Sequence, residues 1–418
     1  MGNPLQHSHG VLLFLVVAAT LVLAWFLPWL VGFAVPSASK SQVVYYSPVS
    51  DKFVTSRSDD DDGKMKYFEL NADGSLSKEV TRDERDRLLP QVFYTVLSGK
   101  DELPDTVCGR QVSIKIFKEN SWVFVSSPRE VNRVNARVDM MMESMPERLE
   151  LEDATEVFRF TSDGMEFVDM ATNAVLPERS ARFTKMLKDE GFAFPATVMN
   201  ANVTSRKPYD EGYLMADANH RLYHVKMQVG RPYVHRVADA EKIDVRHVFV
   251  TENVDHRFLG VVTDADHNVY MLEASTYAMR RMPFKWNPET EKIVMMANVF
   301  NWVVNVNDGD KIEYCAVDNN SMSLLSNFSE KIAKSRYEKL EAYVFPFTLS
   351  FTSGNDQLVY PRIAFAGSWM VLVFNAVLAV VAFAVCRRCR RKAVASGIVT
   401  LILGIYVFIP ILLFTNSK

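Results

Sequence analysis

Histidines give the first hint of chemistry in this chain, because six of its eight lie between His220 and His267. His220 and His224 have the spacing that places two zinc ligands on one face of a helix. Here that spacing falls in a predicted hairpin, and His220 and His267 take the same place in two similar turns. Turns often require φ > 0, which His tolerates better than most residues. Turn roles are therefore favoured over a zinc site, and no metal ligand is assigned.

Acidic residues offer two further kinds of site. The segment Asp264-Ala265-Asp266-His267-Asn268 begins like a calcium-binding loop, but such a loop requires Gly at its sixth position and Glu at its twelfth. This chain has Val269 and Ser275 there. A carboxylate pair for glycoside hydrolysis could come from Glu152, Asp153, Asp169, Asp210 and Glu211.

The sequence contains no nucleophile elbow, Walker-type loop or dinucleotide fingerprint. Choosing two carboxylates from fifty acidic residues has no basis without geometry. We therefore expect a protein that is not an enzyme, with no catalytic residues, no cofactor and no cofactor-binding residues.

Short strands joined by polar turns recur along the chain and would position these residues. The clearest pair has turns at Asp217-Ala218-Asn219-His220 and Asp264-Ala265-Asp266-His267. Weaker copies have turns at 71–74, 118–120, 162–164 and 307–309, and the copy at 118–120 takes residues 113–117 as its first strand. Alternating apolar residues after each turn are typical of hairpins.

The turns recur roughly every 42 to 56 residues, close to the period of β-propeller blades. The fold class that we expect is mainly β, with propeller-like repeated hairpins in about six units and three transmembrane helices. Another mostly β architecture is the alternative. Helices are expected at 129–145, 180–190 and 329–343.

Three long apolar runs, residues 11–35, 363–385 and 393–414, flank this region. Each is long enough to cross a bilayer, which requires about 20 residues. Between the last two lies a short basic loop, and such loops stay on the cytoplasmic side. The residues that determine the topology are Arg387, Arg388, Arg390, Arg391 and Lys392.

This orientation divides the chain into seven segments. They are a cytoplasmic N-terminus (1–10), an uncleaved anchor helix (11–35), an external β-rich domain (36–362), a second helix (363–385), the cytoplasmic loop (386–392), a third helix (393–414) and an external tail (415–418). A cleaved signal peptide is the alternative for 11–35, but its apolar core is usually about 7–15 residues long and follows basic residues.

The four cysteines fall into two pairs. Cys108 and Cys315 lie in the external domain, where a disulfide is permitted, and two buried free thiols are the alternative. Cys386 and Cys389 form a C-x-x-C motif in the basic loop, without the second pair that a zinc site requires or the context of a redox motif.

The apolar helices contain small residues that would let other helices approach closely, among them Gly367, Ala376 and Gly397. The formal net charge is only −3, so the sequence carries no electrostatic footprint for nucleic acid. The partners that we expect are the lipid bilayer and a membrane protein.

Several segments also resemble a known family. The chain is similar to membrane-anchored domain-of-unknown-function proteins of Bacteroidales bacteria in residues 145–149, 158–160, 166–169, 191–195, 212–217 and 222–227. The resemblance implies that this multi-pass protein lies in a bacterial inner membrane, with its main domain (36–362) and its tail (415–418) in the periplasm. It also implies genes beside ABC-type transporters, and it supplies no catalytic residues.

The leading hypothesis is a non-enzymatic accessory or interaction subunit of an ABC-type transporter, with a permease as its partner. One alternative is a stand-alone periplasmic sensor or carbohydrate-binding protein. Another is a membrane-anchored hydrolase. The sequence does not select the ligand, the partner or the stoichiometry.

Overall fold

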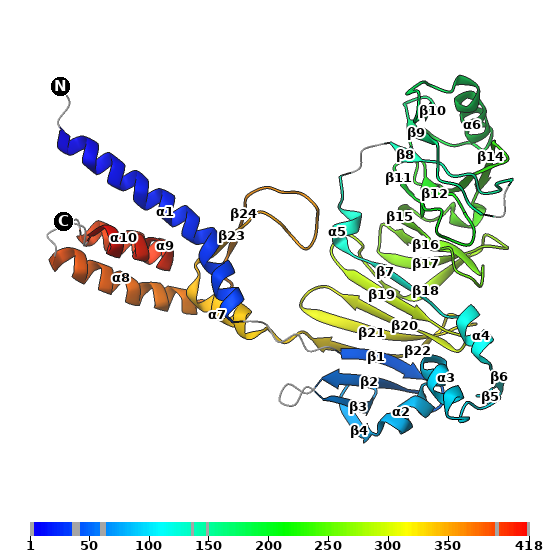
Figure 1. Ribbon diagram of the computed structural model, residues 1–418, viewed down its shortest axis with the longest axis horizontal. Helices are drawn as coiled ribbons and strands as arrows, with labels where there is room; N and C mark the ends of the chain where they lie inside the picture. The colour runs from blue at the N-terminus through cyan, green and yellow to red at the C-terminus, as the bar shows by residue number, and fades with distance from the viewer. Residues whose placement is uncertain are drawn as a thin grey trace. The chain divides into compact units, whose positions relative to one another are not determined.

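The computed structural model describes residues 4–35, 42–58, 64–134, 138–147, 150–388 and 393–415 and divides the chain into two compact units (Figure 1). The sheet unit is Gln42–Ile332. The helical unit combines Met1–Ser41 with Ala333–Lys418.

Five antiparallel sheets of three to five strands form most of the sheet unit. Two of them are β1–β2–β3–β4 (Gln42–Ser47, Lys52–Ser58, Met65–Leu70, Leu76–Val80) and β22–β21–β20–β19–β7 (Leu324–Lys331, Lys311–Asp318, Asn301–Asn307, Lys292–Ala297, Trp122–Ser126). The others are β15–β16–β17–β18 (Val245–Val250, Phe258–Asp264, Asn268–Glu273, Met279–Lys285), β11–β12–β13–β14 (Val198–Asn200, Tyr213–Ala216, Leu222–Gln228, Arg231–Arg236) and β10–β9–β8 (Met165–Asp169, Glu156–Phe160, Asp139–Met140).

Shorter elements connect these sheets. They are α2 (Arg82–Leu88), α3 (Pro90–Gly99), β5 (Thr106–Val107), β6 (Arg110–Gln111), α4 (Ile114–Glu119), α5 (Pro128–Val131), α6 (Pro177–Asp189) and η1 (Ala238–Ala240).

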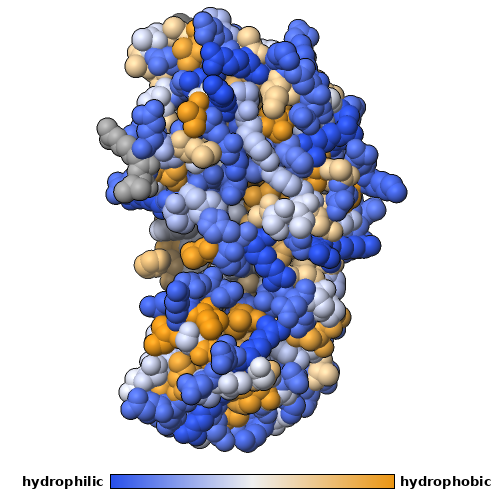
Figure 2. All heavy atoms as spheres, turned by 90° about the vertical axis from the view of Figure 1, so that its right-hand side faces the viewer, coloured by the Kyte–Doolittle hydropathy of each residue, from blue (hydrophilic) through white to orange (hydrophobic). Residues whose placement is uncertain are grey.

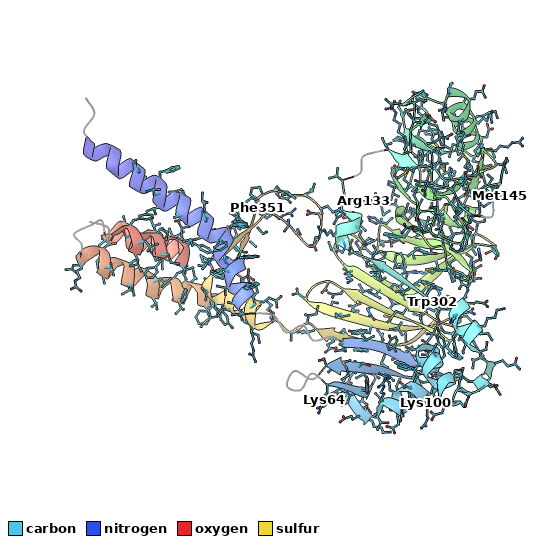
Figure 3. The ribbon with its side chains drawn as sticks, viewed as in Figure 1. Lys64, Lys100, Arg133, Met145, Trp302 and Phe351 are labelled. Carbon is cyan, nitrogen blue, oxygen red and sulfur yellow. The ribbon has the colours of Figure 1, made fainter. Side chains whose placement is uncertain are left out.

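The five sheets lie one above another, with an apolar core between each neighbouring pair (Figure 1). Trp302 of β20 lies inside this stack (Figure 3) and is 1% exposed. Every residue of β16 is buried, because the β15–β18 sheet has cores on both faces. A strand that is buried on both faces has a continuous run of apolar residues, whereas a strand with one face in water alternates apolar and polar residues.

The prediction of mainly β structure is confirmed. The described strands form several small open sheets, five of which have three to five strands, and the propeller stays a prediction. At one end of the stack, α6 covers the free edge of β10. The hydroxyls of Thr184 and Ser180 accept hydrogen bonds from the amides of Met165 and Phe167, both at 2.9 Å. Capping an edge in this way blocks pairing with a further strand.

The predicted turns at 71–74, 162–164, 217–220, 264–267 and 307–309 each join two paired strands, as expected. Residues 113–117 are wrong as a strand, because Ile114–Glu119 is helix α4. The Ser113 hydroxyl accepts a hydrogen bond from the Ile116 amide at 3.2 Å and caps that helix.

The predicted helices are corrected in their bounds. The helix expected at 180–190 is α6 and begins three residues earlier, at Pro177. That expected at 329–343 is α7 and begins at Arg336, where the N-cap Ser335 forms a capping box with Glu338, since Ser329 lies in β22. Among the described residues of 129–145, which exclude 135–137, only the end of α5 is helical, and 139–140 form β8.

The helical unit contains α1 (Pro4–Ala34), α7 (Arg336–Val344), the hairpin β23–β24 (Phe347–Ser350, Arg362–Phe365), α8 (Met370–Arg388), α9 (Ala393–Leu403) and α10 (Ile405–Thr415). Two helical segments, Leu13–Ala34 and Met370–Arg388, are long and apolar enough to cross a membrane, and the first could also be a signal sequence. The second expected helix therefore starts later than residue 363, because 362–365 form β24.

A third membrane-spanning helix at 393–414 is not formed. Gly404 has a left-handed backbone conformation (φ +59°) and separates α9 from α10, each of 11 residues. A helix of that length measures about 16 Å, roughly half the hydrocarbon thickness of a bilayer. The Asn375 side chain of α8 donates to the Leu401 carbonyl at 3.2 Å, next to this break. It satisfies a backbone group in an apolar region.

Gly260 of β16 provides a test of how the sheets stack. A Cβ added there would lie 2.2 Å from the Phe249 carbonyl oxygen and 2.6 Å from Cδ1 of Leu214 on the adjacent sheet. We expect Gly260→Ala to lower the free energy of unfolding by about 1–3 kcal/mol or more, as overpacking does. Urea denaturation measures this. Gly99→Ala is the matched control, since its Cβ would meet nothing within 4 Å. Equal stabilities would contradict the close approach.

Candidate functional site

A buried cluster of charges lies in the sheet unit, where the 201–212 segment meets the loop after β15. The Lys207 ammonium lies 2.6 Å from Oδ1 of Asp210 and 2.6 Å from Oε1 of Glu252. The side chains of the three residues are only 2–4% exposed. Lys207 also donates to the Asn202 carbonyl at 2.5 Å, so its three N–H groups each have an acceptor.

The carboxylates of this cluster are fully occupied by local donors. Asp210 Oδ2 accepts from the Ser144 hydroxyl at 2.5 Å and the Gly212 amide at 3.1 Å. Glu252 accepts from the Glu211 amide at 2.8 Å and from Asn202 Nδ2 at 2.9 Å. Burial raises the pKa of Glu252, and Lys207 counteracts that rise.

A chain of polar side chains surrounds His224, next to this cluster. Nε2 of the ring lies 2.6 Å from the Glu211 carbonyl, which can only accept, so Nε2 carries the proton. Nδ1 then accepts from the Tyr277 hydroxyl at 2.8 Å, and that hydroxyl in turn accepts from Tyr233 at 2.9 Å. Burial is the largest cause that lowers the pKa of His224, to about 4, so the ring is neutral at pH 7.

Glu211 joins the two groups of residues. Its side chain lies 2.8 Å from the Lys226 ammonium, and its backbone contacts both Glu252 and His224. These contacts fix the long segment between β11 and β12 onto two sheets. The charged and polar groups of this network pair with one another. We therefore interpret the network as part of the structure.

The five predicted acids are only partly brought together. Asp210 and Glu211 lie in the buried network, and sequence reasoning missed their partners Lys207, Glu252 and His224. Asp169 lies elsewhere, where its carboxylate caps the turn at Thr172 and hydrogen bonds from Thr172 lower its pKa. Asp210 and Glu252 are enclosed and hold one ammonium, which is not the arrangement of a water-accessible carboxylate pair for glycoside hydrolysis.

The turn roles of His220 and His267 are confirmed, whereas His224 lies in β13. His220 has φ +58° and His267 has φ +63°. In each turn the preceding aspartate accepts two backbone amides: Asp217 those of residues 219 and 221, Asp264 those of residues 266 and 268. No group of three His, Cys, Asp or Glu side chains that could hold a metal ion occurs among the residues that the structure describes.

Cys108 and Cys315 are free thiols, so the possible disulfide between them is not formed. Cys315 is buried on β21 within the core beside Trp302. Cys108 is exposed in the β5–β6 turn, where its thiol lies 3.1 Å from the Pro48 carbonyl. Only one of the two is therefore a buried thiol.

Two of the five residues expected to determine topology lie at the end of α8. Arg387 and Arg388 form its last turn, whereas Arg390, Arg391 and Lys392 lie outside the described residues, as does Cys389.

Of the expected helix-packing residues, Gly397 alone lies at a described helix contact. A Cβ added there would lie 3.6 Å from the Ala379 carbonyl oxygen and from Cβ of Phe383, both on α8. Ala376 is exposed on α8. Gly367 precedes α8, and nothing lies within 4 Å of its added Cβ, so its role in helix packing stays a prediction.

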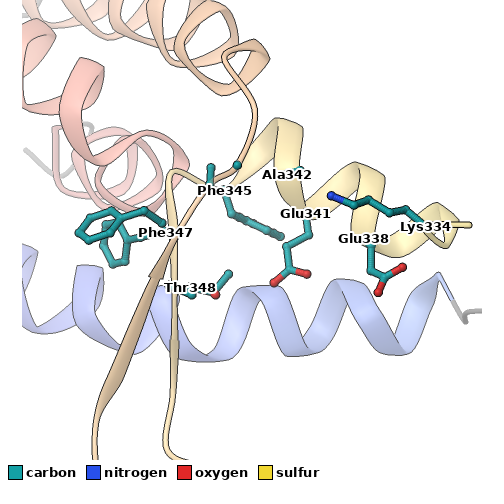
Figure 4. Close-up of a pocket in the computed structure, with 11 residues that line it drawn as sticks. Lys334, Glu338, Glu341, Ala342, Phe345, Phe347 and Thr348 are labelled. Atoms are coloured by element: carbon teal, nitrogen blue, oxygen red, sulfur yellow. The ribbon is translucent and has the colours of Figure 1, made fainter. Parts of the chain in front are cut away.

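A cavity of about 280 Å³ occurs in the helical unit, between α7 and the base of the β23–β24 hairpin (Figure 4). Glu338, Glu341 and the aromatic rings of Phe345 and Phe347 are among the residues that line it. Burial and, secondarily, the Glu338 charge raise the pKa of Glu341. The Glu338 carboxylate caps α7 by accepting from the Ser335 amide at 2.6 Å. The volume is at the lower limit for a ligand site.

These features define a stacked antiparallel sheet unit joined to apolar helices. The model of a family described as a domain of unknown function (DUF4857) matches residues 43–317. This match covers more than half of the chain, so the protein belongs to the DUF4857 family. This match confirms the expected resemblance to a family of uncharacterised domains.

No curated protein matches the sequence. Among solved structures, it is similar to PorZ, an essential surface component of the type-IX secretion system of Porphyromonas gingivalis, at 8% identity and a TM-score of 0.22 over 72% of this chain and 33% of PorZ. It is also similar to TolB from Acinetobacter baumannii, at 10% identity and a TM-score of 0.23 over 71% of this chain and 80% of TolB. The chain spans about a third of PorZ, and neither similarity at these TM-scores supports an argument.

Removing the ammonium from the charge cluster should be costly. We expect Lys207→Met to lower the free energy of unfolding by about 3–5 kcal/mol, because Asp210 and Glu252 would stay buried without a cation. The loss should be smaller at pH 5 than at pH 8, since a buried carboxyl with a raised pKa takes up a proton more easily. Lys185→Met is the control, because its pair with Asp189 is 77% and 53% exposed. Similar losses for both variants would contradict this.

His224 should make stability depend on pH. Its pKa in the folded protein, about 4, is below its ordinary value of 6.5. Its contribution is therefore complete above pH 6.5 and is lost as the pH falls towards 4. We expect wild type to lose about 2 kcal/mol more than His224→Gln between pH 7.5 and pH 5. Chemical denaturation at the two pH values measures this, and parallel losses would show that the ring is not held neutral.

Proposed function

We propose that this protein is a non-enzymatic accessory or interaction subunit anchored in a bacterial inner membrane. Its sheet unit lies in the periplasm, and an ABC-type permease is the class of partner. The observation that supports anchoring most directly is the exposure of apolar side chains along both long helices. Phe14 of α1 is 70% exposed, and Leu372 and Val380 of α8 are 62% and 69% exposed. Surfaces of this kind require lipid or another apolar partner.

The proposed orientation rests on the charges at the end of α8. Arg387 and Arg388 occupy its last turn, and basic residues next to a membrane helix favour the cytoplasmic side. Two crossings, α1 outward and α8 inward, suffice to place residues 42–332 in the periplasm. α9 and α10 pack against α8 and α1, and neither is long enough to cross alone.

A role in interaction is supported by the surface and by the interior of the sheet unit. Figure 2 shows apolar residues gathered in the lower part of one face, in the region of α3, α4, β5 and β6. Tyr94, Leu103 and Val299 pack only partly buried against the small core there. The charged network at Lys207 is enclosed and serves the fold, so it supports no reaction. The permease is proposed from the family resemblance of the sequence.

Native co-purification tests the proposal, with Gly397 as the sensitive position. Tagged wild type extracted in mild detergent should recover a permease and its ATPase, identified by mass spectrometry. Gly397→Leu should reduce that recovery several-fold, because the longer side chain has no room against Ala379 and Phe383.

Gly397→Ala is the matched control, because its Cβ would meet α8 at an ordinary contact distance of 3.6 Å. Its recovery of the partner should equal that of wild type. Wild type recovered alone would contradict the accessory role and favour a stand-alone sensor or ligand-binding protein.

A further inference from the structure

The β23–β24 hairpin exposes apolar side chains on a very small element. Val359, Ile363 and Phe365 are 74%, 59% and 80% exposed, and Trp369, just before α8, is 70% exposed. A hairpin of two strands is only marginally stable alone in water. Apolar exposure on this scale marks a surface that another apolar phase covers.

Contacts within the helical unit place the hairpin beside the C-terminal third of α1. The Phe351 ring, at the start of the hairpin turn (Figure 3), lies edge-on to Trp25 at 6.1 Å between ring centroids. The Tyr337 hydroxyl of α7, just before β23, donates to the Pro28 carbonyl at 3.1 Å. Trp25 and Trp29 are themselves 50% and 62% exposed. Exposed Trp and Tyr side chains at one level of apolar helices are typical of a membrane interface.

The length of α8 gives a second, independent measure of that level. Its 19 residues from Met370 to Arg388 span about 28 Å at 1.5 Å per residue, close to the hydrocarbon thickness of about 30 Å. If Arg387 and Arg388 mark one boundary, Trp369 marks the other. β24 ends only four residues before Trp369, so the hairpin begins at the same boundary.

The backbone limits how deeply the hairpin can enter. Its two strands leave their outer edges unpaired within the hairpin, and unpaired edges are not tolerated in hydrocarbon. Arg362 pairs with Asp356 at 2.6 Å and lies 3.8 Å from the centroid of the Tyr360 ring. Paired charges next to apolar and aromatic side chains suit the headgroup region, where water still reaches the backbone.

We propose that the surface formed by Val359, Tyr360, Ile363, Phe365 and Trp369 binds the outer interface of the lipid bilayer. The hairpin then acts as a second, monotopic contact that sets the depth of the helical unit. This inference rests on the membrane anchoring of the proposed function and not on its transporter partner. Lipid is the chosen occupant because the hairpin continues directly into the apolar surface of α8.

Depth-dependent quenching tests this in the full-length protein, in phosphatidylcholine vesicles without any partner. Three single-cysteine variants carry an environment-sensitive fluorophore on a cysteine-free background: Phe365→Cys, Val380→Cys in the middle of α8 and Val254→Cys in the sheet unit. All three positions are exposed, at 80%, 69% and 62%. Lipids with a nitroxide at carbon 5 or carbon 12 of the acyl chain act as shallow and deep quenchers.

We expect the label at 365 to be quenched several-fold more by the shallow than by the deep lipid. The label at 380 should show the opposite order, and the label at 254 should be quenched by neither. A label at 365 that behaves like 254 while 380 is quenched overturns the hairpin inference alone and points to a protein partner on this surface. Absence of quenching at both 365 and 380 overturns the anchoring as well.

Discussion

Burial of sheets on both faces is the constraint on which the sheet unit depends. The β15–β18 sheet separates two apolar cores, one containing Trp286 and Trp302 and the other Leu214 and Val262. A sheet with two apolar faces cannot exist alone in water, so each sheet requires a neighbour on either side. Burial of both faces requires a row of sheets, and the row ends at a sheet with one buried face. In the terminal sheet, β9 buries Phe158 but exposes Arg159, while α6 protects the free edge of β10.

Local chemistry explains which parts of this fold the sequence predicts. The turns at Asp217 and Asp264 are encoded within five residues, because each aspartate accepts the amides that follow it. A strand was predicted where helix α4 forms, because the apolar residues Ile114, Ile116 and Phe117 fit a short strand as well as one helical turn. Only the capping hydroxyl of Ser113 favours the helix. The third apolar run fails at Gly404, where Asn375 of another helix supports the break.

The charged network around Lys207 could not be predicted for a different reason. Asp210 is three residues from Lys207, but Glu252 lies 45 residues away and reaches the ammonium only after two sheets have packed. Burying three charges costs several kcal/mol per ion, which the mutual contacts must offset. Such a cluster stabilises the fold weakly compared with an apolar core, yet it specifies one position for the long segment before β12. The spacing of these residues in the sequence does not predict that Lys207 and Glu252 come into contact.

The two ends of the sheet unit lie close together, and this explains how it can be inserted between the two parts of the helical unit. Gln42, the first residue of β1, donates to the Glu330 carboxylate at 3.1 Å, and Arg57 pairs with the same carboxylate at 3.2 Å. Glu330 is the penultimate residue of β22, so one side chain joins the start of the unit to its end. A domain with adjacent ends can be inserted into another unit without strain. Both ends then connect to the helical unit, whose α1 precedes the sheet unit in the chain and whose α7 follows it.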